Sequence, residues 1–162
     1  MEINYLDHTR SGWLGRQPKR VSSAAVILEN ESGEVLTIKA KYKSYWALPS
    51  GIIDPGETPR EGALRETMEE VGIDIHPEVI EFVAVVNRCS DYAQTYQFVF
   101  RAPLETKMVD HISLQASEIE AYALVTKEQV LSADREYGEV LRYWALGTTG
   151  YIEQVLGKRS DT

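Results

Sequence analysis

The sequence has only one cysteine, Cys89, among its 162 residues. A single thiol cannot form an intramolecular disulfide, and it cannot build a zinc site that needs several cysteines. The three histidines, His8, His76 and His111, are scattered and lack the spacing of metal ligands. A disulfide-stapled fold and a cysteine-rich zinc site are therefore excluded, and we assign these four residues no role in the chemistry.

Long hydrophobic runs are also missing. No stretch of about 18 apolar residues that could cross a membrane occurs, and residues 1–10 are too polar for a secretory signal. We therefore expect a cytoplasmic protein with no membrane partner. The 162 residues, 43% of them hydrophobic, are enough for one domain with its own core.

Positive charge is scarce. Seventeen Lys and Arg residues stand against twenty-five Asp and Glu residues, which gives a formal net charge of −8. Such a surface opposes nonspecific binding to DNA or RNA, which depends on neutralising phosphates with basic side chains. A small polyphosphate can still bind where cations reverse the local field. The charge balance therefore predicts no nucleic-acid polymer partner, and it allows a small polyphosphate only if a divalent metal binds with it.

The segment 51–73, GIIDPGETPREGALRETMEEVGI, carries the clearest pattern in the sequence. Thr58 and Glu61 have the spacing of a capping box, a proline stands at the first helical position, and Gly72 stands where a C-terminal cap belongs. These signals predict a helix over residues 59–71.

The predicted helix has an acidic side formed by Glu66, Glu69 and Glu70. At 100° per residue, the residues expected to pack lie on nearly the opposite side: Leu64, Thr67, Met68 and Val71. Uncompensated like charges three or four residues apart destabilise a helix, so a positive group should lie beside the glutamates. Mg²⁺ and Mn²⁺ prefer oxygen ligands and share carboxylates with substrate phosphates, and Gly51 would let the backbone come close to such an ion. The segment predicts a divalent-cation site, although an acidic helical face by itself is more often a solvated surface.

The same segment resembles the Nudix box, written G-x5-E-x7-R-E-U-x-E-E-x-G-U, in which U is apolar. Nine specified positions carry the resemblance: Gly51, Glu57, Arg65, Glu66, Thr67, Glu69, Glu70, Gly72 and Ile73. Thr67 is the one departure, because its position is normally apolar, but its methyl group can still pack. A solvated acidic face would require neither the glycine, nor Glu57, nor Arg65, so the full set favours membership of the Nudix hydrolase family.

The resemblance implies hydrolysis of a diphosphate linkage with Mg²⁺ or Mn²⁺ as cofactor. The implied metal ligands are Glu66, Glu69, Glu70 and the carbonyl group of Gly51. Bound cations lower the pKa of water, which then attacks phosphorus. Arg65 is implied to orient the cluster and Glu57 to brace the loop, while Glu66 or Glu69 would serve as general base.

Other candidates lie outside the box. Family members often recruit a carboxylate from a later loop, for which Glu118 is preferred over Glu120, and either can equally be a surface residue. Lys39 and Lys41 would share one side with Lys43 if their strand continued through all three, and could then meet phosphates. Solvent-facing lysines along a strand edge would explain the same pattern.

Aromatic residues are candidates for binding a base. Tyr45 could stack on a nucleobase, whereas we expect Trp46 to pack in the core and Tyr92 to pack in its loop. Arg88 and Cys89 occupy the place where ADP-ribose-hydrolysing members often carry a proline, which weakens that specificity. The expected substrate is a nucleoside triphosphate or a nucleoside diphosphate-linked compound.

Two other readings remain open at this point. The first is a catalytically silent Nudix-like nucleotide-binding module, although the box has lost none of its carboxylates. The second is a diphosphate isomerase, which is disfavoured because its catalytic cysteine would precede the box. The family also makes a homodimer a candidate assembly.

Alternating and continuous apolar runs predict the remaining elements. Strands are expected at 21–28, 35–40, 46–48, 79–86, 95–100 and 122–125, and helices at 127–131 and 137–146. The resemblance implies an α/β fold, a Nudix-type α/β/α sandwich with a mixed β-sheet between helices. We expect an N-terminal extension over 1–20 that is a leader, an edge strand or a lid, a Nudix hydrolase domain over 21–156, and a disordered tail over 157–162.

Overall fold

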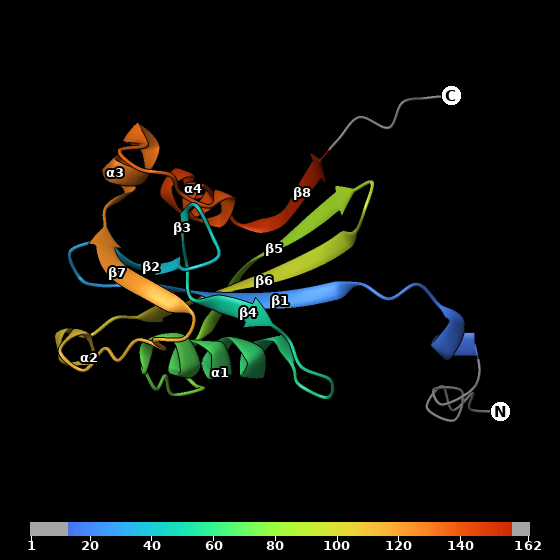
Figure 1. Cartoon of the computed structure of the whole chain (residues 1–162), viewed down its shortest axis with the longest axis horizontal. Coiled ribbons are helices and arrows are strands. Elements are labelled where there is room, and N and C mark those ends of the chain that lie inside the picture. The colour runs from blue at the N-terminus through green and yellow to red at the C-terminus, as the bar shows by residue number, and fades with distance from the viewer. Residues whose placement is uncertain (1–12, 157–162) are drawn as a thin grey trace.

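The computed structural model describes residues 13–156, and these form one mixed β-sheet covered by helices on both faces (Figure 1). The eight strands are β1 (Val21–Glu29), β2 (Val35–Ala40), β3 (Trp46–Ala47), β4 (Ser50–Ile52), β5 (Glu81–Ser90), β6 (Gln94–Pro103), β7 (Ile119–Val125) and β8 (Gly150–Leu156). The helices are the 3-10 helix η1 (Trp13–Arg16) and α1 (Pro59–Val71), α2 (Thr106–Val109), α3 (Lys127–Ser132) and α4 (Glu139–Leu146). The expectations for residues 1–12 and 157–162 fall outside this part of the chain. Within residues 13–156 no helix is both long and apolar enough to cross a membrane.

The sheet is mixed because β1 pairs in both directions. It runs antiparallel to β2 and β4 and parallel to β6, while β5 pairs antiparallel with β6 and parallel with β8. The main path through the sheet is β3-β2-β1-β6-β5-β8, and β7 pairs with β2. The predicted mixed sheet is thereby confirmed.

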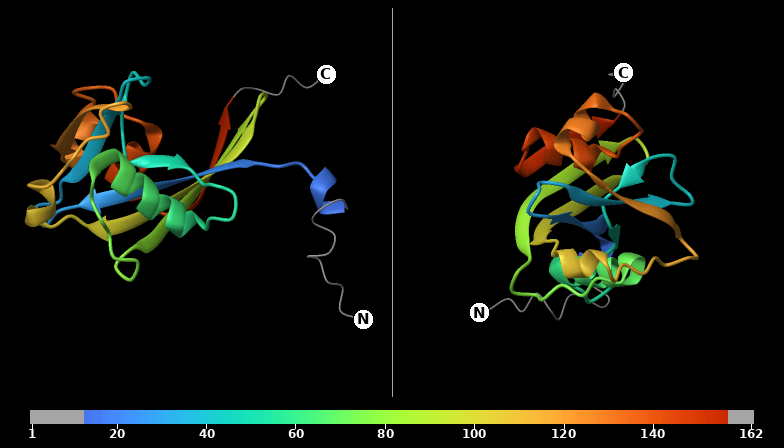
Figure 2. Two further views of the ribbon diagram at one scale, coloured as in Figure 1. Left: turned by 60° about the horizontal axis from the view of Figure 1, so that its bottom comes forward. Right: turned by 90° about the vertical axis from the view of Figure 1, so that its left-hand side faces the viewer.

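Strand β1 shows why the sheet lies between two layers. Ala24, Val26 and Leu28 pack with residues of α1, whereas Ala25 and Ile27 on the other face pack with residues of α4. A strand buried on both faces has no polar alternation, which explains its continuous apolar sequence. Figure 2 shows α1 on one face of the sheet and α3 with α4 on the other, which confirms the α/β/α sandwich.

Helix α1 begins and ends at the residues predicted from sequence. Thr58 and Glu61 form both hydrogen bonds of the capping box. Gly72 has the left-handed φ of 70°, and its N–H donates to the carbonyl of Met68 at 3.0 Å. The local signals were sufficient here because each satisfies a backbone group at a helix end.

The predicted faces of α1 were partly wrong. Met68, expected to pack, is 53% exposed, whereas Glu70, expected on the opposite side, is only 3% exposed. The buried stripe follows Ala63, Thr67, Glu70 and Val71, with the i, i+4, i+7, i+8 spacing of a helix packed along one side. Glu70 can lie in this stripe because a backbone N–H across the interface satisfies its carboxylate. Thr67 packs as expected, and its hydroxyl donates to the carbonyl of Ala63 at 2.8 Å.

Besides the 3-10 helix η1, three elements were not predicted. Strand β4 has three residues and is formed only through pairing with β1, in which Gly51 lies opposite Ala24. Helix α2 is a single turn, and β8 is an exposed edge strand with polar residues among its apolar ones. Such short or edge elements are determined by tertiary pairing, which a local pattern does not record. The predicted helix over 137–146 begins two residues later, because Tyr137 forms a β-bridge with Trp46.

Helix α3 ends with a strained backbone, which gives a stability prediction. Ala133 adopts the left-handed conformation, with φ 52° and ψ 45°, at a position where glycine has no steric penalty. We expect Ala133→Gly to raise the free energy of unfolding by about 1 kcal/mol in urea titrations. Ala116→Gly is the control, because Ala116 is exposed and has a negative φ, and we expect it to lower stability instead. Equal effects of the two substitutions would contradict the assignment of strain.

Candidate active site

Strand β4 brings the backbone directly against the acidic helix. A Cβ atom at Gly51 would lie 2.0 Å from the carboxyl carbon of Glu66 and 2.1 and 2.4 Å from its two oxygens. No side chain fits in this space, so glycine is required for the Glu66 carboxylate to rest on the strand. The predicted close approach at Gly51 is therefore present, and its nearest partner in this structure is Glu66.

Glu70 is the most buried acid of the cluster. Its Oε2 accepts a hydrogen bond of 2.8 Å from the backbone N–H of Ser50. Burial raises the pKa of Glu70 to about 7, and the negative charges of Glu66 and Glu118 add to this effect. The Ser50 hydrogen bond and the nearby Lys43 oppose it without cancelling it. A buried carboxylate with more negative than positive neighbours is a position that a cation would stabilise.

Arg65 joins the carboxylates to the loop before the helix. Its Nε and Nη2 donate to Glu57 at 2.8 and 3.0 Å, its Nη1 donates to Glu66 at 2.7 Å and to Glu69 at 3.2 Å, and its Nη2 also donates to the carbonyl of Ile52 at 2.9 Å. Glu57 in turn accepts a 2.9 Å hydrogen bond from the N–H of Asp54. The Arg65 hydrogen bonds, followed by that of Asp54, hold the pKa of the Glu57 carboxyl below its usual range. Arg65 and Glu57 thus connect helix and loop.

The remaining box glutamates differ in environment. Burial raises the pKa of Glu66, although the hydrogen bond and charge of Arg65 act in the other direction. Glu69 is half exposed and contacts Arg65 only through its 3.2 Å bond. Arg65 binds the carboxylates of both Glu66 and Glu69, but of these two only Glu66 lies against β4.

These carboxylates fit a hard cation by their chemistry. Glu66, Glu69 and Glu70 supply oxygen donors, and burial is the main cause of the raised pKa values of Glu66 and Glu70, to which neighbouring negative charges add. Within residues 13–156, however, no three acidic, histidine or cysteine side chains surround one point as a metal site would require. Arg65 instead binds Glu66 and Glu69, and the N–H of Ser50 binds Glu70.

The two later-loop candidates lie in different places. Burial is the main cause of the raised pKa values of Glu66, Glu70 and the hydroxyl of Tyr42, and the negative charge of Glu118 adds to each of them, so Glu118 lies near the acidic cluster. Glu120 is exposed on β7. The structure brings Glu118 toward the site and leaves Glu120 on the strand surface.

The lysine candidates do not form a row along a strand. Strand β2 ends at Ala40, and the ammonium groups of Lys39 and Lys41 donate to the carbonyls of Lys43 and Ala116. The strand therefore does not continue through Lys41 and Lys43, and the prediction that the three lysines share one side of it was wrong. Lys43 differs from the other two, because its ammonium lies 5.4 Å from the Tyr42 ring centre and 5.9 Å from that of Tyr45.

The aromatic candidates also separate. Tyr45 lines a cavity beside the site, whereas Tyr92 is 98% exposed, so its expected packing in the loop was wrong. Trp46 is half buried, with the Arg135 guanidinium 5.0 Å above its ring.

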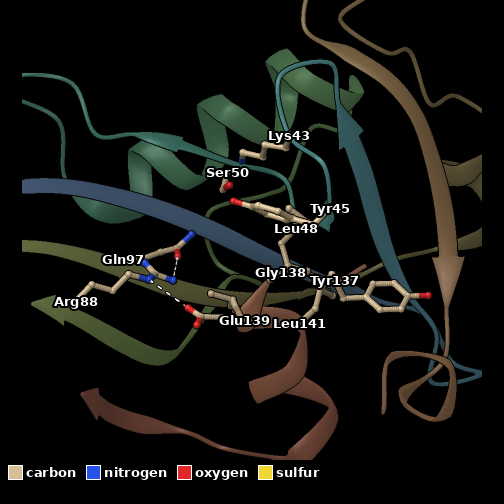
Figure 3. Close-up of a pocket in the computed structure, with 12 residues that line it drawn as sticks. Lys43, Tyr45, Leu48, Ser50, Arg88, Gln97, Tyr137, Gly138, Glu139 and Leu141 are labelled. Atoms are coloured by element: carbon tan, nitrogen blue, oxygen red, sulfur yellow. Dashed lines mark hydrogen bonds and ion pairs between the residues drawn. The ribbon is translucent and has the colours of Figure 1, made fainter. Parts of the chain in front are cut away.

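The cavity has a volume of about 430 Å³ (Figure 3). Its polar lining comes from the segment after β2, from β4, β5 and β6, and from the residues around the start of α4: Lys43, Tyr45, Ser50, Arg88, Gln97, Tyr137 and Glu139. Ser50 joins the two regions, because it lines the cavity and its N–H donates to Glu70. A ligand in the cavity would thus extend toward the acidic cluster.

Ser50, Gln97 and Glu139 were not predicted as site residues from the sequence. Arg88 was noted only because it stands where some family members carry a proline. A signal existed for Arg88, which continues the alternation of the buried Ala84 and Val86 along β5. A charged residue in the register of a buried face indicates that the face opens into a polar site. Glu139, at the start of α4, had no comparable signal.

A family model described as NUDIX domain matches residues 19–144. A protein of Bacillus subtilis (strain 168) named "Putative 8-oxo-dGTP diphosphatase" is 49% identical over 49 residues, covering 30% of this chain and 33% of that protein. An RNA pyrophosphohydrolase of Psychrobacter cryohalolentis is 36% identical over 78 residues, covering 48% of this chain and 44% of that protein. The chain thus spans less than half the length of these curated relatives.

Solved structures agree on the fold. The crystal structure of MutT protein from Methanosarcina mazei Go1 matches with a TM-score of 0.65 at 23% identity, covering 82% of this chain and 96% of that one. At this identity the match shows the architecture alone. Because the family model spans most of the described residues and the box lies on α1 and β4, the chain belongs to the Nudix hydrolase family.

Proposed function

We propose that this protein hydrolyses a diphosphate linkage in a nucleoside triphosphate or a nucleoside diphosphate-linked compound, with Mg²⁺ or Mn²⁺ as cofactor. One observation carries the proposal. The buried Glu70 carboxylate is bound to the N–H of Ser50, and Ser50 also lines the adjoining cavity. A substrate held in that cavity would therefore bring its phosphates next to the carboxylates.

The residues that would hold the cation are Glu66, Glu69, Glu70 and the carbonyl oxygen of Gly51. When bound, the cation supplies charge neutralisation at phosphorus and water of lowered pKa. Lys43 lies at the cavity and adds positive charge for the phosphates of the substrate. Glu66 or Glu69 would take the proton of the attacking water. Arg65 holds both carboxylates by hydrogen bonds, that of Glu66 against β4 and that of Glu69 on the solvent side.

Arg65 acts as a positioning residue in this proposal, which gives a testable expectation. A lysine at this position cannot make hydrogen bonds to Glu57, Glu66, Glu69 and Ile52 together, because its ammonium is a point charge without a planar fork. We expect Arg65→Lys to lower kcat by about 10- to 100-fold, with a smaller change in KM, in steady-state assays. Arg60→Lys is the control, because Arg60 contacts the carbonyl of Pro77 away from the cluster. Unchanged kcat in Arg65→Lys would contradict the positioning role.

The substrate class is tested by a panel assayed with Mg²⁺. The panel contains nucleoside triphosphates, 8-oxo-dGTP, dinucleoside polyphosphates, nucleotide sugars, ADP-ribose and an RNA with a 5′ triphosphate. We expect cleavage of one phosphoanhydride bond and incorporation of ¹⁸O from labelled water into one phosphorylated product. Nucleotide binding without turnover across the panel would instead support the silent binding module.

A further inference from the structure

Lys43 differs from the two lysines before it in what its ammonium group contacts. The ammonium groups of Lys39 and Lys41 donate to backbone carbonyls and thereby hold the segment after β2 in place. Within residues 13–156, in contrast, no hydrogen bond or ion pair involves the Lys43 ammonium. Lys43 lines the cavity, so its charge is available to a ligand there.

Two tyrosine rings flank this ammonium group. Lys43 Nζ lies 5.4 Å from the ring centre of Tyr42 and 5.9 Å from that of Tyr45, and both distances are within the range of a cation–π contact. A ring face attracts a cation but carries no net charge, so the ammonium keeps its full charge for an anion. We call these three residues the lysine clamp: Tyr42, Lys43 and Tyr45. Figure 3 shows the Lys43 side chain pointing toward Ser50.

The Tyr45 ring is held against a glycine. A Cβ on Gly138 would lie 3.1 and 3.2 Å from two carbons of this ring. Gly138 has φ −65° and ψ 154°, a conformation open to any residue, so the nearby ring and not the backbone favours glycine here. The N–H of Gly138 donates to the carbonyl of Trp46 at 2.8 Å, which ties the start of α4 to the segment that carries Tyr45. The ring is therefore in position before a ligand binds.

The lysine clamp is also close to the acidic cluster. Burial raises the pKa of Glu70 to about 7, and the positive charge of Lys43 is one of the effects that oppose this rise. Burial likewise raises the pKa of the Tyr42 hydroxyl, and the negative charge of Glu70 is the next cause. Lys43 therefore lines the cavity while its charge reaches the carboxylate that lies deepest in the cluster.

We propose that Tyr42 and Tyr45 are positioning residues that hold the Lys43 ammonium for a direct contact with a substrate phosphate. An ammonium group offers three N–H donors and a full positive charge to phosphate oxygens. A lysine side chain loses rotamer freedom when it binds a ligand, and rings that already hold it reduce this cost. The Tyr45 ring then supports Lys43 instead of stacking on a base. The inference rests on the proposed function, because that function brings phosphates to this end of the cavity.

Methylenediphosphonate, a diphosphate analogue that water does not cleave, tests the contact without a base and without turnover. We expect the analogue to bind in the presence of Mg²⁺ in isothermal titration calorimetry. Lys43→Met keeps the length of the side chain but removes its charge, and should raise Kd by at least about tenfold. Lys127→Met is the matched control, because Lys127 lies 5.5 Å from the Trp144 ring centre but does not line the cavity, and it should leave Kd unchanged. No binding to the wild-type protein, or an unchanged Kd in Lys43→Met, would overturn the assignment.

Substitutions of Tyr42 test the positioning role. This side chain is 66% exposed, so its replacement should leave the fold intact. We expect Tyr42→Leu to raise Kd for the analogue by about two- to tenfold, and Tyr42→Phe to keep the wild-type value, because the ring and not the hydroxyl holds the ammonium. The same pair of substitutions at Tyr45 should behave alike.

A double-mutant cycle separates positioning from packing. In a Lys43→Met background the ammonium is gone, so Tyr42→Leu should cause no further rise in Kd. An equal effect in the two backgrounds, or no effect in the wild-type background, would overturn the positioning role. Normal binding of the analogue with no turnover across the substrate panel would overturn the proposed function and keep this assignment.

Discussion

Glu70→Gln is expected to lower kcat by roughly 100-fold or more while leaving the fold intact. The substitution keeps the shape of the side chain, and its amide oxygen can still accept the hydrogen bond from the N–H of Ser50. What it removes is one negative charge from the proposed cation site. Steady-state assays with Mg²⁺ and with Mn²⁺ measure the loss.

The same substitution should raise the stability of the metal-free protein, although it lowers kcat. Burial raises the pKa of Glu70 from its ordinary 4.5 to about 7, so the folded state keeps a proton that the unfolded state releases. Stability of the metal-free wild type therefore falls as pH rises from about 4.5 to about 7, by up to about 3 kcal/mol. Glutamine does not titrate, so Glu70→Gln should lack this fall and be the more stable protein at pH 8 in urea titrations.

The control for both effects is Glu78→Gln, at a side chain that is 88% exposed. It should change neither turnover nor the dependence of stability on pH. Near wild-type turnover in Glu70→Gln would contradict the metal role. An unaltered slope of stability between pH 4.5 and 7 would contradict the burial of an uncompensated charge.

Gly51→Ala is expected to have the second large effect, again roughly 100-fold or more on kcat. The new Cβ would occupy the space of the Glu66 carboxyl group, with contacts of 2.0 to 2.4 Å. The tip of Glu66 can swing aside at modest cost in stability, but its carboxylate would then leave the cluster. Activity and thermal stability should therefore respond very differently, the first strongly and the second weakly.

A double-mutant cycle isolates this contact. In a Glu66→Ala background the side chain that collides with the new Cβ is gone, so Gly51→Ala should cause little further loss of activity. A full additional loss in that background would show that Gly51 acts through something other than the position of Glu66.

The sequence predicted local structure around the box more completely than it predicted the surroundings. Helix α1 was placed correctly because Thr58, Glu61 and Gly72 act through bonds within the helix and its caps. The position of Glu70 on the buried side of α1 was not predicted. This side chain is buried because β4 pairs with β1 and presents the N–H of Ser50 to it. Its burial is a tertiary effect without a local pattern.

The cavity could not be predicted from the sequence for a related reason. Arg88 and Gln97 come together because β5 pairs with β6, and Glu139 joins them because α4 packs on the same face of the sheet. The lysine prediction failed where it assumed a longer strand than β2, which ends at Ala40. Spacing along the chain could identify the acidic residues, whereas the residues that surround a substrate depend on strand order.

The central claim is that a divalent cation binds between the acidic side of α1 and strand β4. Crystals of the protein grown with Mn²⁺ would test it directly, by anomalous diffraction at the manganese absorption edge. We predict an anomalous peak within coordination distance of the carboxylates of Glu66 and Glu70 and of the Gly51 carbonyl oxygen. No peak there, with those carboxylates still bound to Arg65 and Ser50, would contradict the account.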